Sequence, residues 1–416
     1  MHKKIINYIK NEAIFKGSII LLISTGILYV CSYLYHFYTG RVLGPEQYSI
    51  IGTLFSLLYI ILVPSNTIQM SITKFVSEFK TKKEYGKIKY LLVKSLKKLF
   101  FYGVLSSIIF IAISPFLAKF LKVPLIPVII LGISIVFSLL IPSARGVLQG
   151  LQSFKSLGIN LSIEGFGKIG FVILLVSLGF GINGAIFALV LSSLVAFLII
   201  LKQLKPIFAY EVEPFETKQV YNYSWPVLMT FLSLTLMYSI DLLLVKHFFS
   251  NIDAGHYAAL SLIGKILFFA TFPIIQVMFP LASELKAEKS EKKHLLHLLY
   301  KSLGIISLIS FGIITLYFLF SRLMVTILFG NDYLNISPLI GFFGIFMLIY
   351  SLIYLFSFYN LSINKTKFVP ILILSNIIEA IFIWFYHPSI LQVVYSLIIL
   401  SFITLIFIIM YTKYSK

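Results

Sequence analysis

The chain has 416 residues, of which 59% are hydrophobic and only 12% are charged, and its mean hydropathy is +0.99. Soluble globular domains are about 45–50% apolar and about 25% charged, so this composition indicates an integral membrane protein and excludes a disordered chain or a coiled coil. The single cysteine, Cys31, cannot form an internal disulfide. A net charge of +19 would suit a nucleic-acid partner, but it is also expected where lysines gather in cytoplasmic loops.

Twelve apolar segments are long enough to cross a bilayer as helices. The hydrocarbon core is about 30 Å thick and takes roughly 20 helical residues. A transmembrane strand would need only about 10 residues and would alternate polar with apolar positions. The residues before the first segment are too many and too charged for a cleavable signal peptide. The first segment is therefore expected to remain as a helix. The predicted spans are residues 17–39, 47–68, 98–118, 124–144, 157–178, 182–201, 224–245, 256–280, 302–320, 336–358, 368–386 and 389–411.

Lysines and arginines are distributed unevenly between the two sides of the predicted membrane protein. With alternate loops on opposite sides, 27 of the 34 basic residues fall on the side of both termini and five on the other, and Lys168 and Lys265 lie within spans. The positive-inside rule predicts a multi-pass protein of the cytoplasmic membrane with both termini in the cytoplasm. This asymmetry explains most of the net charge, so no nucleic-acid partner is predicted. The basic segments 80–98 and 286–301 are expected to lie on the inner leaflet, attracted by anionic membrane lipids.

The loops on the predicted outer side are short. The longest, around 246–256 and 321–335, have no room for a folded domain. Membrane glycosyltransferases and polysaccharide polymerases generally carry large external loops with catalytic residues, so the sequence does not favour an enzyme. It also has no glycine-rich phosphate loop and no nucleophile arrangement, and no cofactor is predicted.

The two halves of the chain resemble each other weakly. Tyr48 matches Tyr257 at an offset of 209 residues, and the segment 91–96 matches 298–303 at an offset of 207. Six helices per half make these parallel repeats, so the sequence predicts an all-α membrane protein with two six-helix lobes around a central cavity. The predicted boundaries are a cytoplasmic N-terminal segment 1–16, an N-lobe 17–201, a cytoplasmic linker 202–223, a C-lobe 224–411 and a cytoplasmic tail 412–416.

Four segments carry a family resemblance. They are Gly-Arg-Val-Leu-Gly-Pro-Glu-Gln-Tyr at 40–48, Ala-Arg-Gly-Val-Leu-Gln-Gly-Leu-Gln-Ser-Phe at 144–154, Asp-Leu-Leu-Leu-Val-Lys at 241–246 with Asp-Ala-Gly-His-Tyr at 253–257, and Pro-Leu-Ala-Ser-Glu at 280–284. In this order they resemble the polysaccharide-exporter branch of the MATE/MOP flippase superfamily, the O-antigen-type lipid-linked oligosaccharide flippases. The resemblance covers residues 15–300 and extends over the last hundred by topology alone.

The resemblance implies a helix bundle that moves isoprenoid-diphosphate-linked sugars from the cytoplasmic to the outer leaflet. It implies a lipid-linked anionic glycan as the partner, with glycosyltransferases of the same pathway as further candidates. The chain fits the twelve-helix core of the family and lacks the extra pair of helices found in many members. It also lacks the arginine within the first helix that cell-wall-precursor flippases use for the diphosphate, which argues against that particular substrate.

The eighth predicted span carries the first candidate binding site. Tyr257, Ser261 and Lys265 recur every four residues and therefore form one polar stripe on an apolar helix. An ionisable residue near the bilayer centre costs at least about 2.5–3.5 kcal/mol on insertion scales, so its presence needs a reason. We expect the Lys265 cation to face a cavity and hold a phosphate; the alternative is a lysine that pairs with a carboxylate and joins helices.

The fifth and eleventh spans carry further charges. Glu164 and Lys168 are four residues apart with the acid first, which is the favourable order for a helical ion pair. Lys168 is therefore either a second substrate-binding cation or the neutralised half of that pair. Glu379 lies at a similar depth in the eleventh span. Together with Glu164, it is a candidate for carrying a coupling Na+ or H+.

Three more charged residues lie nearer the ends of predicted spans. Asp241 is expected near the outer end of the seventh span, where it could partner a lysine or gate the outer mouth. Arg41 and Arg145 are expected at helix ends, where long side chains reach the lipid headgroups. Because both lie in the family-like segments, a role in substrate entry or gating is the alternative.

The sequence therefore predicts a flippase that translocates an isoprenoid-(di)phosphate-linked oligosaccharide by alternating access. A cation-coupled exporter of small molecules with the same fold is the first alternative. A membrane glycosyltransferase or polymerase is the second, and a scaffold without transport activity is the third.

Overall fold

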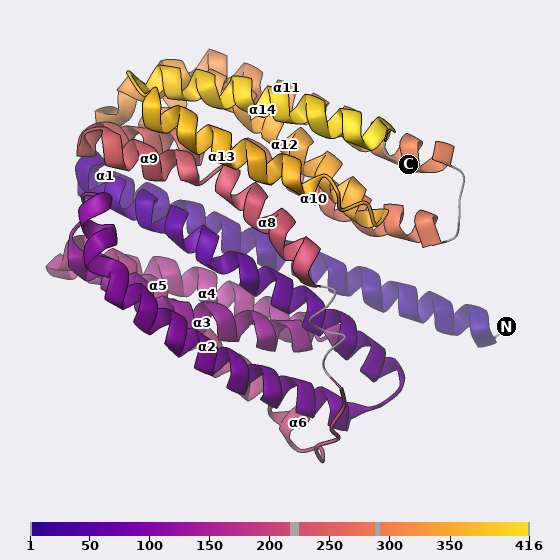
Figure 1. Ribbon diagram of the computed structural model, residues 1–416. Coiled ribbons are helices and arrows are strands. Elements are labelled where there is room, and N and C mark those ends of the chain that lie inside the picture. Colours follow the sequence, from indigo (N-terminus) through magenta and orange to yellow (C-terminus); the bar gives the residue numbers. More distant parts are fainter. Residues whose placement is uncertain (1, 217–223, 288–291, 415–416) are drawn as a thin grey trace. The chain divides into compact units, whose positions relative to one another are not determined.

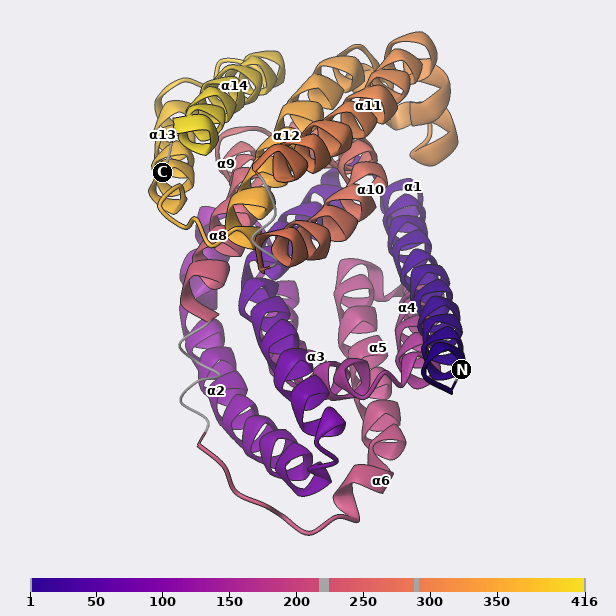
Figure 2. The same ribbon diagram turned by 90° about the vertical axis from the view of Figure 1, so that its right-hand side faces the viewer.

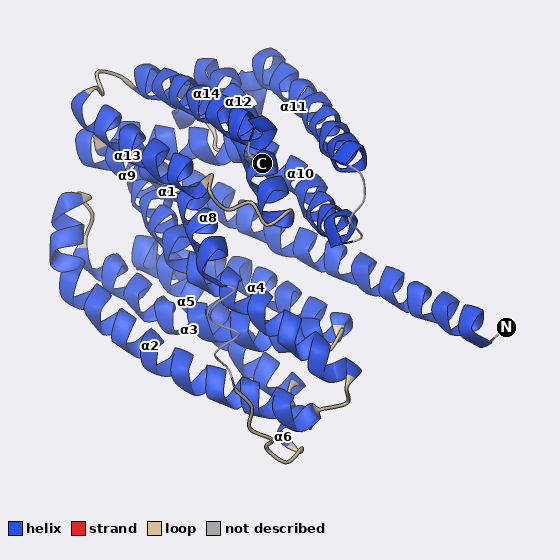
Figure 3. Ribbon diagram, turned by 45° about the vertical axis from the view of Figure 1, so that its right-hand side comes forward, coloured by secondary structure: helices blue, strands red, loops and turns tan. Residues whose placement is uncertain are grey.

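The computed structural model describes residues 2–216, 224–287 and 292–414. Every element in these residues is a helix, and no strand occurs among them (Figure 3). Figure 1 traces the chain from its indigo N-terminus to its yellow C-terminus. The prediction of an all-α membrane fold is confirmed. Residues 217–223 of the predicted linker and residues 415–416 of the predicted tail lie outside the described residues.

The apolar helices agree with the predicted spans. Nine helical stretches of the described residues are long and apolar enough to cross a membrane. Two of these, Ile23–Thr81 with 59 residues and Phe154–Gln203 with 50, are each long enough for two spans of roughly 20 residues. A tenth apolar helix, Val369–Phe385, is slightly shorter. Apart from a few end residues and a turn at residues 238–239 in the seventh span, each of the twelve predicted segments therefore lies in helical residues of the structure.

The chain forms two compact units. The first consists of Met1–Val42 and Ile61–Trp225. Within it, α3 packs between α2 and α5, and α4 packs against α5 (Figure 2). Its elements are most of α1 (His2–Thr81), followed by α2 (Tyr85–Phe120), α3 (Leu125–Gly150), α4 (Phe154–Leu175), a π-helical turn η1 (Val176–Phe180), α5 (Gly181–Gln203) and the short α6 (Lys205–Phe208).

The second unit consists of Leu43–Ile60 and Pro226–Lys416. Its central element is α12, which packs against α10, α11 and α14 and buries most of its length. The elements of this unit are α8 (Ser224–Met237), α9 (Ile240–Phe248), α10 (Asn251–Ala287), α11 (Lys292–Leu328), a 3-10 helix η2 (Asn331–Leu339), α12 (Ile340–Ser362), α13 (Val369–Phe385) and α14 (Ile390–Tyr414).

A glycine separates the first two predicted spans. Gly44 has φ 75° and ψ 172° and interrupts the helical geometry of α1. This backbone conformation is readily available only to glycine, and Pro45 follows with the fixed φ that suits a helix start. The predicted N-lobe included the residues after this kink, but their contacts group residues 43–60 with the second unit. Tyr48, for example, packs its ring against Phe329 and Tyr333, with ring centroids 5.3 and 6.2 Å away.

The described parts of the basic segments lie mostly at the ends of long helices, and residues 288–291 lie outside the described residues. Residues 85–98 are the first part of α2, a single helix of 36 residues, and residues 292–301 begin α11 in the same way. At 1.5 Å per residue α2 is about 54 Å long, so its basic end extends beyond a hydrocarbon core of about 30 Å. The lysines of residues 85–98 therefore lie at the end of a long apolar helix, and their attraction to the anionic inner leaflet stays a prediction.

Candidate functional site

The first unit holds a buried cluster of charges between α3 and α4. Arg145 is 9% exposed, and its Nη2 lies 2.6 Å from Oε2 of Glu164. The Nε of the same guanidinium donates a hydrogen bond to Oδ1 of Asn160 over 2.8 Å. The expectation that the Arg145 side chain reaches the headgroups from a helix end is therefore wrong, because the side chain points inward and is held at two of its nitrogens.

Lys168 belongs to the same cluster. Its Nζ lies 3.5 Å from Oε1 of Glu164, so one carboxylate serves two cations. The contact to Arg145 is the shorter and includes a hydrogen bond, which makes Arg145 the principal partner. The predicted pairing of Glu164 with Lys168 is present, but it does not neutralise the cluster. The three side chains together carry one excess positive charge.

Asn160 completes the cluster on α4. Its side chain is fully buried, and its Nδ2 donates a hydrogen bond to the backbone carbonyl of Ala196 on α5 over 2.7 Å. Asn160 therefore orients the guanidinium of Arg145 while α5 orients Asn160. The residue was not predicted as part of the site, although it lies four residues before Glu164, on the same face of the helix.

The second unit holds a different set of buried polar groups. The hydroxyl of Tyr257 on α10 donates a hydrogen bond to Oδ2 of Asp241 on α9 over 2.6 Å. Neither side chain is exposed to solvent. Tyr257 thus holds the carboxylate in place across two helices. Of the two lysines considered as partners for Asp241, Lys265 interacts with it electrostatically, whereas Lys246 donates hydrogen bonds to Ser49 and Asn251.

Lys265 is surrounded by aromatic rings. Its Nζ stands 4.9 Å from the ring centroid of Tyr238 and 5.8 Å from that of Tyr59. Within the part of the chain that the structure describes, no carboxylate lies within ion-pair distance of this ammonium, and the side chain is 6% exposed. Cation–π contacts contribute about 2 kcal/mol when desolvated, which is less than a buried ion pair would supply. Lys265 therefore lies beside aromatic rings and within the electrostatic influence of Asp241, without a direct ion pair.

Several buried oxygen atoms of the second unit lack hydrogen-bond partners among the described residues. They are Oδ1 of Asp241 and Oε1 of Glu379, together with Oδ1 of Asn376 and the hydroxyl of Ser261. Glu379 and Asp241 interact electrostatically, and α9 packs against α13, the helix of Glu379 and Asn376. Asn376 was not predicted, although it lies three residues before Glu379 and so on the same side of the helix. Carboxylate, amide and hydroxyl oxygens are the groups that bind hard cations.

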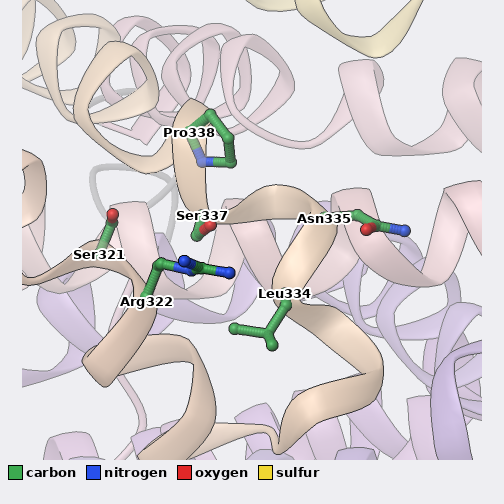
Figure 4. A pocket seen from close by; sticks show the side chains of 6 residues that line it. All are labelled: Ser321, Arg322, Leu334, Asn335, Ser337 and Pro338. Atoms are coloured by element: carbon green, nitrogen blue, oxygen red, sulfur yellow. The ribbon is translucent and has the colours of Figure 1, made fainter.

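The last of the predicted residues lies close in sequence to the kink in α1. Arg41 is exposed and is three residues before the kink at Gly44. Arg322, which lies on the predicted outer side, lines a separate polar cavity of about 730 Å³. Figure 4 shows its guanidinium between Ser337 and Leu334 of η2. This cavity contains none of the residues predicted for the site.

No group of three or more histidine, cysteine, aspartate or glutamate side chains in the described ranges is arranged to hold a metal ion. The first cluster is net positive and suits an anion. The second combines one lysine beside aromatic rings with acidic groups that suit a small cation.

The sequence matches one protein family. Residues 39–338 match the family described as polysaccharide biosynthesis protein. The chain is also 27% identical to an uncharacterized membrane protein of Methanocaldococcus jannaschii over 293 residues, which are 65% of this chain and 68% of that protein.

Solved structures with the same fold are transporters. One is a multidrug resistance transporter of the MATE family in an inward-facing conformation, with a TM-score of 0.79, 13% identity, and coverage of 95% of this chain and 100% of that chain. Another is a MOP-superfamily transporter from Pyrococcus furiosus whose binding pocket has reversed polarity, with a TM-score of 0.71, 15% identity, and coverage of 96% and 95%. At these identities the likeness establishes the fold and nothing finer.

Proposed function

Because the chain belongs to the polysaccharide biosynthesis family of the MOP transporter superfamily, we propose that it is a flippase for an isoprenoid-(di)phosphate-linked oligosaccharide. It moves this lipid from the cytoplasmic to the outer leaflet of the cell membrane by alternating access. Both termini lie in the cytoplasm, in agreement with the excess of basic residues on their side. Glycosyltransferases that assemble the glycan are the expected partners in the cell.

The observation that carries this proposal is the excess positive charge buried in the first unit. Arg145 and Lys168 share the single carboxylate of Glu164. A cluster that served only to join helices would be expected to balance its charges, because an uncompensated buried charge costs several kcal/mol. An incoming phosphate supplies the missing negative charge. The cost of keeping the extra cation is therefore recovered when substrate binds.

Lys265 is the cation proposed for the second unit. Its aromatic neighbours, Tyr59 and Tyr238, attract the ammonium without neutralising it, as a carboxylate would. Aromatic rings also stack on the apolar faces of sugars, so the same neighbours suit a glycan that follows the phosphate. Ser261 has an unpartnered hydroxyl one helical turn from Lys265 and is a further donor for the substrate.

Export is driven by the membrane potential, by an ion gradient, or by both. With the inside negative by about 100 mV, the outward movement of two negative charges gains about 4–5 kcal/mol. Asp241 and Glu379 with their unpartnered oxygens are the proposed sites for a coupling Na+ or H+. Glu164 is assigned no coupling role, because it is already committed to Arg145 and Lys168.

The proposal is tested by reconstitution in liposomes. The purified chain is mixed with a fluorescent polyprenyl-diphosphate oligosaccharide, and the label in the outer leaflet is followed by quenching under an imposed potential. Native protein is expected to flip this lipid, and Lys168→Ala and Lys265→Ala are each expected to slow it about tenfold, the effect of about 1.4 kcal/mol. Lys122→Ala, in a loop on the predicted outer side, is the control. Unchanged rates in both lysine variants would remove the cationic-site mechanism.

A cation-coupled exporter of small molecules is the second candidate function. It is favoured by one observation, the acidic groups Asp241 and Glu379 buried in the second unit. Liposomes loaded with organic cations distinguish the two functions. Export of such cations without any flipping of the glycolipid would support this alternative and contradict the flippase.

A further inference from the structure

An apolar groove lies in the membrane-spanning part of the first unit. It has a volume of about 460 Å³ and is lined by eleven side chains of α1, α2 and α3. Among these side chains, only Tyr102 and Ser106 carry a polar atom. Sites for small organic ligands have volumes of about 300–1,000 Å³, so the groove is large enough to hold part of a lipid chain.

One face of α2 forms the length of the groove. Tyr102, Ser106, Ile109 and Ile113 line it at spacings of four, three and four residues, which places them on one side of the helix. The stretch from Tyr102 to Ile113 is about 17 Å long at 1.5 Å per residue. A leaflet contributes half of a hydrocarbon core of about 30 Å, so the groove spans about one leaflet.

The same face of α2 continues into basic residues. Lys98 and Lys94 precede Tyr102 by four and eight residues, so they extend the line of groove residues toward the N-terminus of the helix. The Lys94 ammonium donates a hydrogen bond to the hydroxyl of Tyr90 over 2.8 Å and lies 4.8 Å from the centre of that ring. Its position is thus fixed while its charge is retained.

We propose that this groove binds the isoprenoid chain of a polyprenyl phosphate, with the phosphate at Lys94 and Lys98. An apolar groove within the bilayer takes hydrocarbon, and a basic end selects hydrocarbon that carries an anionic head. That end is the one that the lysine distribution places in the cytoplasm, which is the side from which the proposed flippase takes its substrate. The choice of isoprenoid over acyl chain rests on the proposed function.

The groove is separate from the charged cluster of the first unit. The tail is held in a groove formed by α1, α2 and α3, whereas the cationic cluster of Arg145 and Lys168 lies between α3 and α4. Binding of the tail therefore does not require the glycan. Lys94 and Lys98 hold the phosphate when the carrier lipid enters the groove, and the charged clusters act on the glycan and its phosphates in the later steps of transport.

The groove is tested by photolabelling of the full chain in nanodiscs with a diazirine analogue of geranylgeranyl phosphate. Labelled peptides are expected from the segment 99–113. Ser106→Trp and Ile109→Trp fill the groove and are expected to lower labelling about tenfold, equivalent to about 1.4 kcal/mol. Ile108→Trp is the matched control, because Ile108 is equally exposed on α2 but does not line the groove. Equal labelling in all three variants would overturn the proposal.

The basic end is tested independently of the groove-filling variants. Lys94→Gln and Lys98→Gln are each expected to weaken binding about fivefold, as expected for one basic residue at a membrane surface. Lys119→Gln, in the last turn at the other end of the same helix, is expected to have little effect. Geranylgeraniol, which has no phosphate, should respond to the tryptophan variants but not to the lysine variants. If a diazirine-labelled phosphatidic acid competes as well as the isoprenyl phosphate, the groove holds bulk membrane lipid and the proposal is wrong.

Failure of the groove proposal and failure of the flippase proposal give different results in the labelling and flipping assays. Labelling of the groove by a chain that flips no glycolipid would retain the site and contradict the proposed function. Flipping that is unaffected by Ser106→Trp and by Lys98→Gln, without specific labelling, would retain the function and contradict the site.

Discussion

Arg145 on α3 and Glu164 on α4 form a buried ion pair, with 2.6 Å between Nη2 and Oε2. Their side chains are 11% and 13% exposed, so water screens the pair only weakly. Lys168 depends on the same carboxylate from one helical turn away. Glu164 is therefore the anchor of a cluster in which two cations would otherwise repel each other within the membrane.

Replacing Glu164 by Gln is expected to destabilise the protein more than replacing either cation. The change leaves Arg145 and Lys168 without their common anion, and breaking a buried pair on one side costs about 3–5 kcal/mol. The free energy of unfolding in detergent measures this loss. In the double variant Glu164→Gln/Arg145→Met one cation is also removed, so the loss is expected to be smaller than the sum of the single effects. Additive effects would show that the two residues do not interact.

Tyr257→Phe tests the hydrogen bond that holds Asp241. The variant keeps the ring, which packs against Phe343, and removes only the hydroxyl. The second oxygen of Asp241 then loses its donor, and an unsatisfied buried acceptor costs about 1–3 kcal/mol. Thermal unfolding of the detergent-solubilised protein measures the effect. Tyr395→Phe is a suitable comparison, because Tyr395 belongs to the same unit and its side chain is exposed. A loss no larger than in that control would contradict the assigned role.

The twelve spans could be predicted from the sequence because membrane insertion depends on hydrophobicity summed over some twenty residues. That sum is large here and tolerates errors of a few residues at each end. The apolar spans predicted the all-α fold. The four short motifs indicated the polysaccharide-exporter family. The extent of the helices was less predictable. The basic residues 85–98 have the amphipathic pattern of a surface helix, but nothing in the pattern shows that α2 is continuous through them.

The partners of charged residues could be predicted only where they lie on one helix. Glu164 and Lys168 are four residues apart, and their contact was expected from helical geometry. The dominant partner of Glu164 is Arg145, which comes from another helix. That contact depends on how α3 packs against α4, and a single sequence does not encode it in any local pattern. The same reason applies to Tyr59 and Tyr238, which surround Lys265 from separate segments.

Gly44→Ala is expected to destabilise the protein through the backbone alone. A Cβ at this position would meet no atom within 4 Å, but φ is +75°. Alanine in such a conformation costs about 1–3 kcal/mol. Gly26→Ala is the matched control: it also has open space, but its φ lies outside the positive range. In a helix this replacement favours folding by up to about 1 kcal/mol. Equal changes in the free energy of unfolding would contradict the kinked geometry at Gly44.

Gly255→Ala is expected to act through packing instead. A Cβ at Gly255 would collide with the backbone carbonyl of Pro45, which cannot turn aside as a side chain can. Overpacking of this kind costs about 3 kcal/mol. Gly304→Ala on α11 has open space and serves as the control. If unfolding measurements gave the same small effect for both variants, Gly255 of α10 would not be in contact with the backbone of Pro45.

Glu379→Gln separates potential-driven from cation-coupled transport. The Glu379 carboxylate is 1% exposed and has an unpartnered Oε1, and it repels Asp241 electrostatically. A sodium ion or a proton that binds during transport would relieve this repulsion. The neutral amide of the variant removes the repulsion itself, so the coupling ion is no longer required. The variant is then expected to flip glycolipid at a rate that no longer depends on the sodium or proton gradient, while the dependence on membrane potential stays. The rate is measured in liposomes with each gradient imposed separately, and Gln392→Glu on α14 controls for a change of charge elsewhere in the unit. A variant that keeps the full gradient dependence of the native protein would show that Glu379 does not carry the coupling ion.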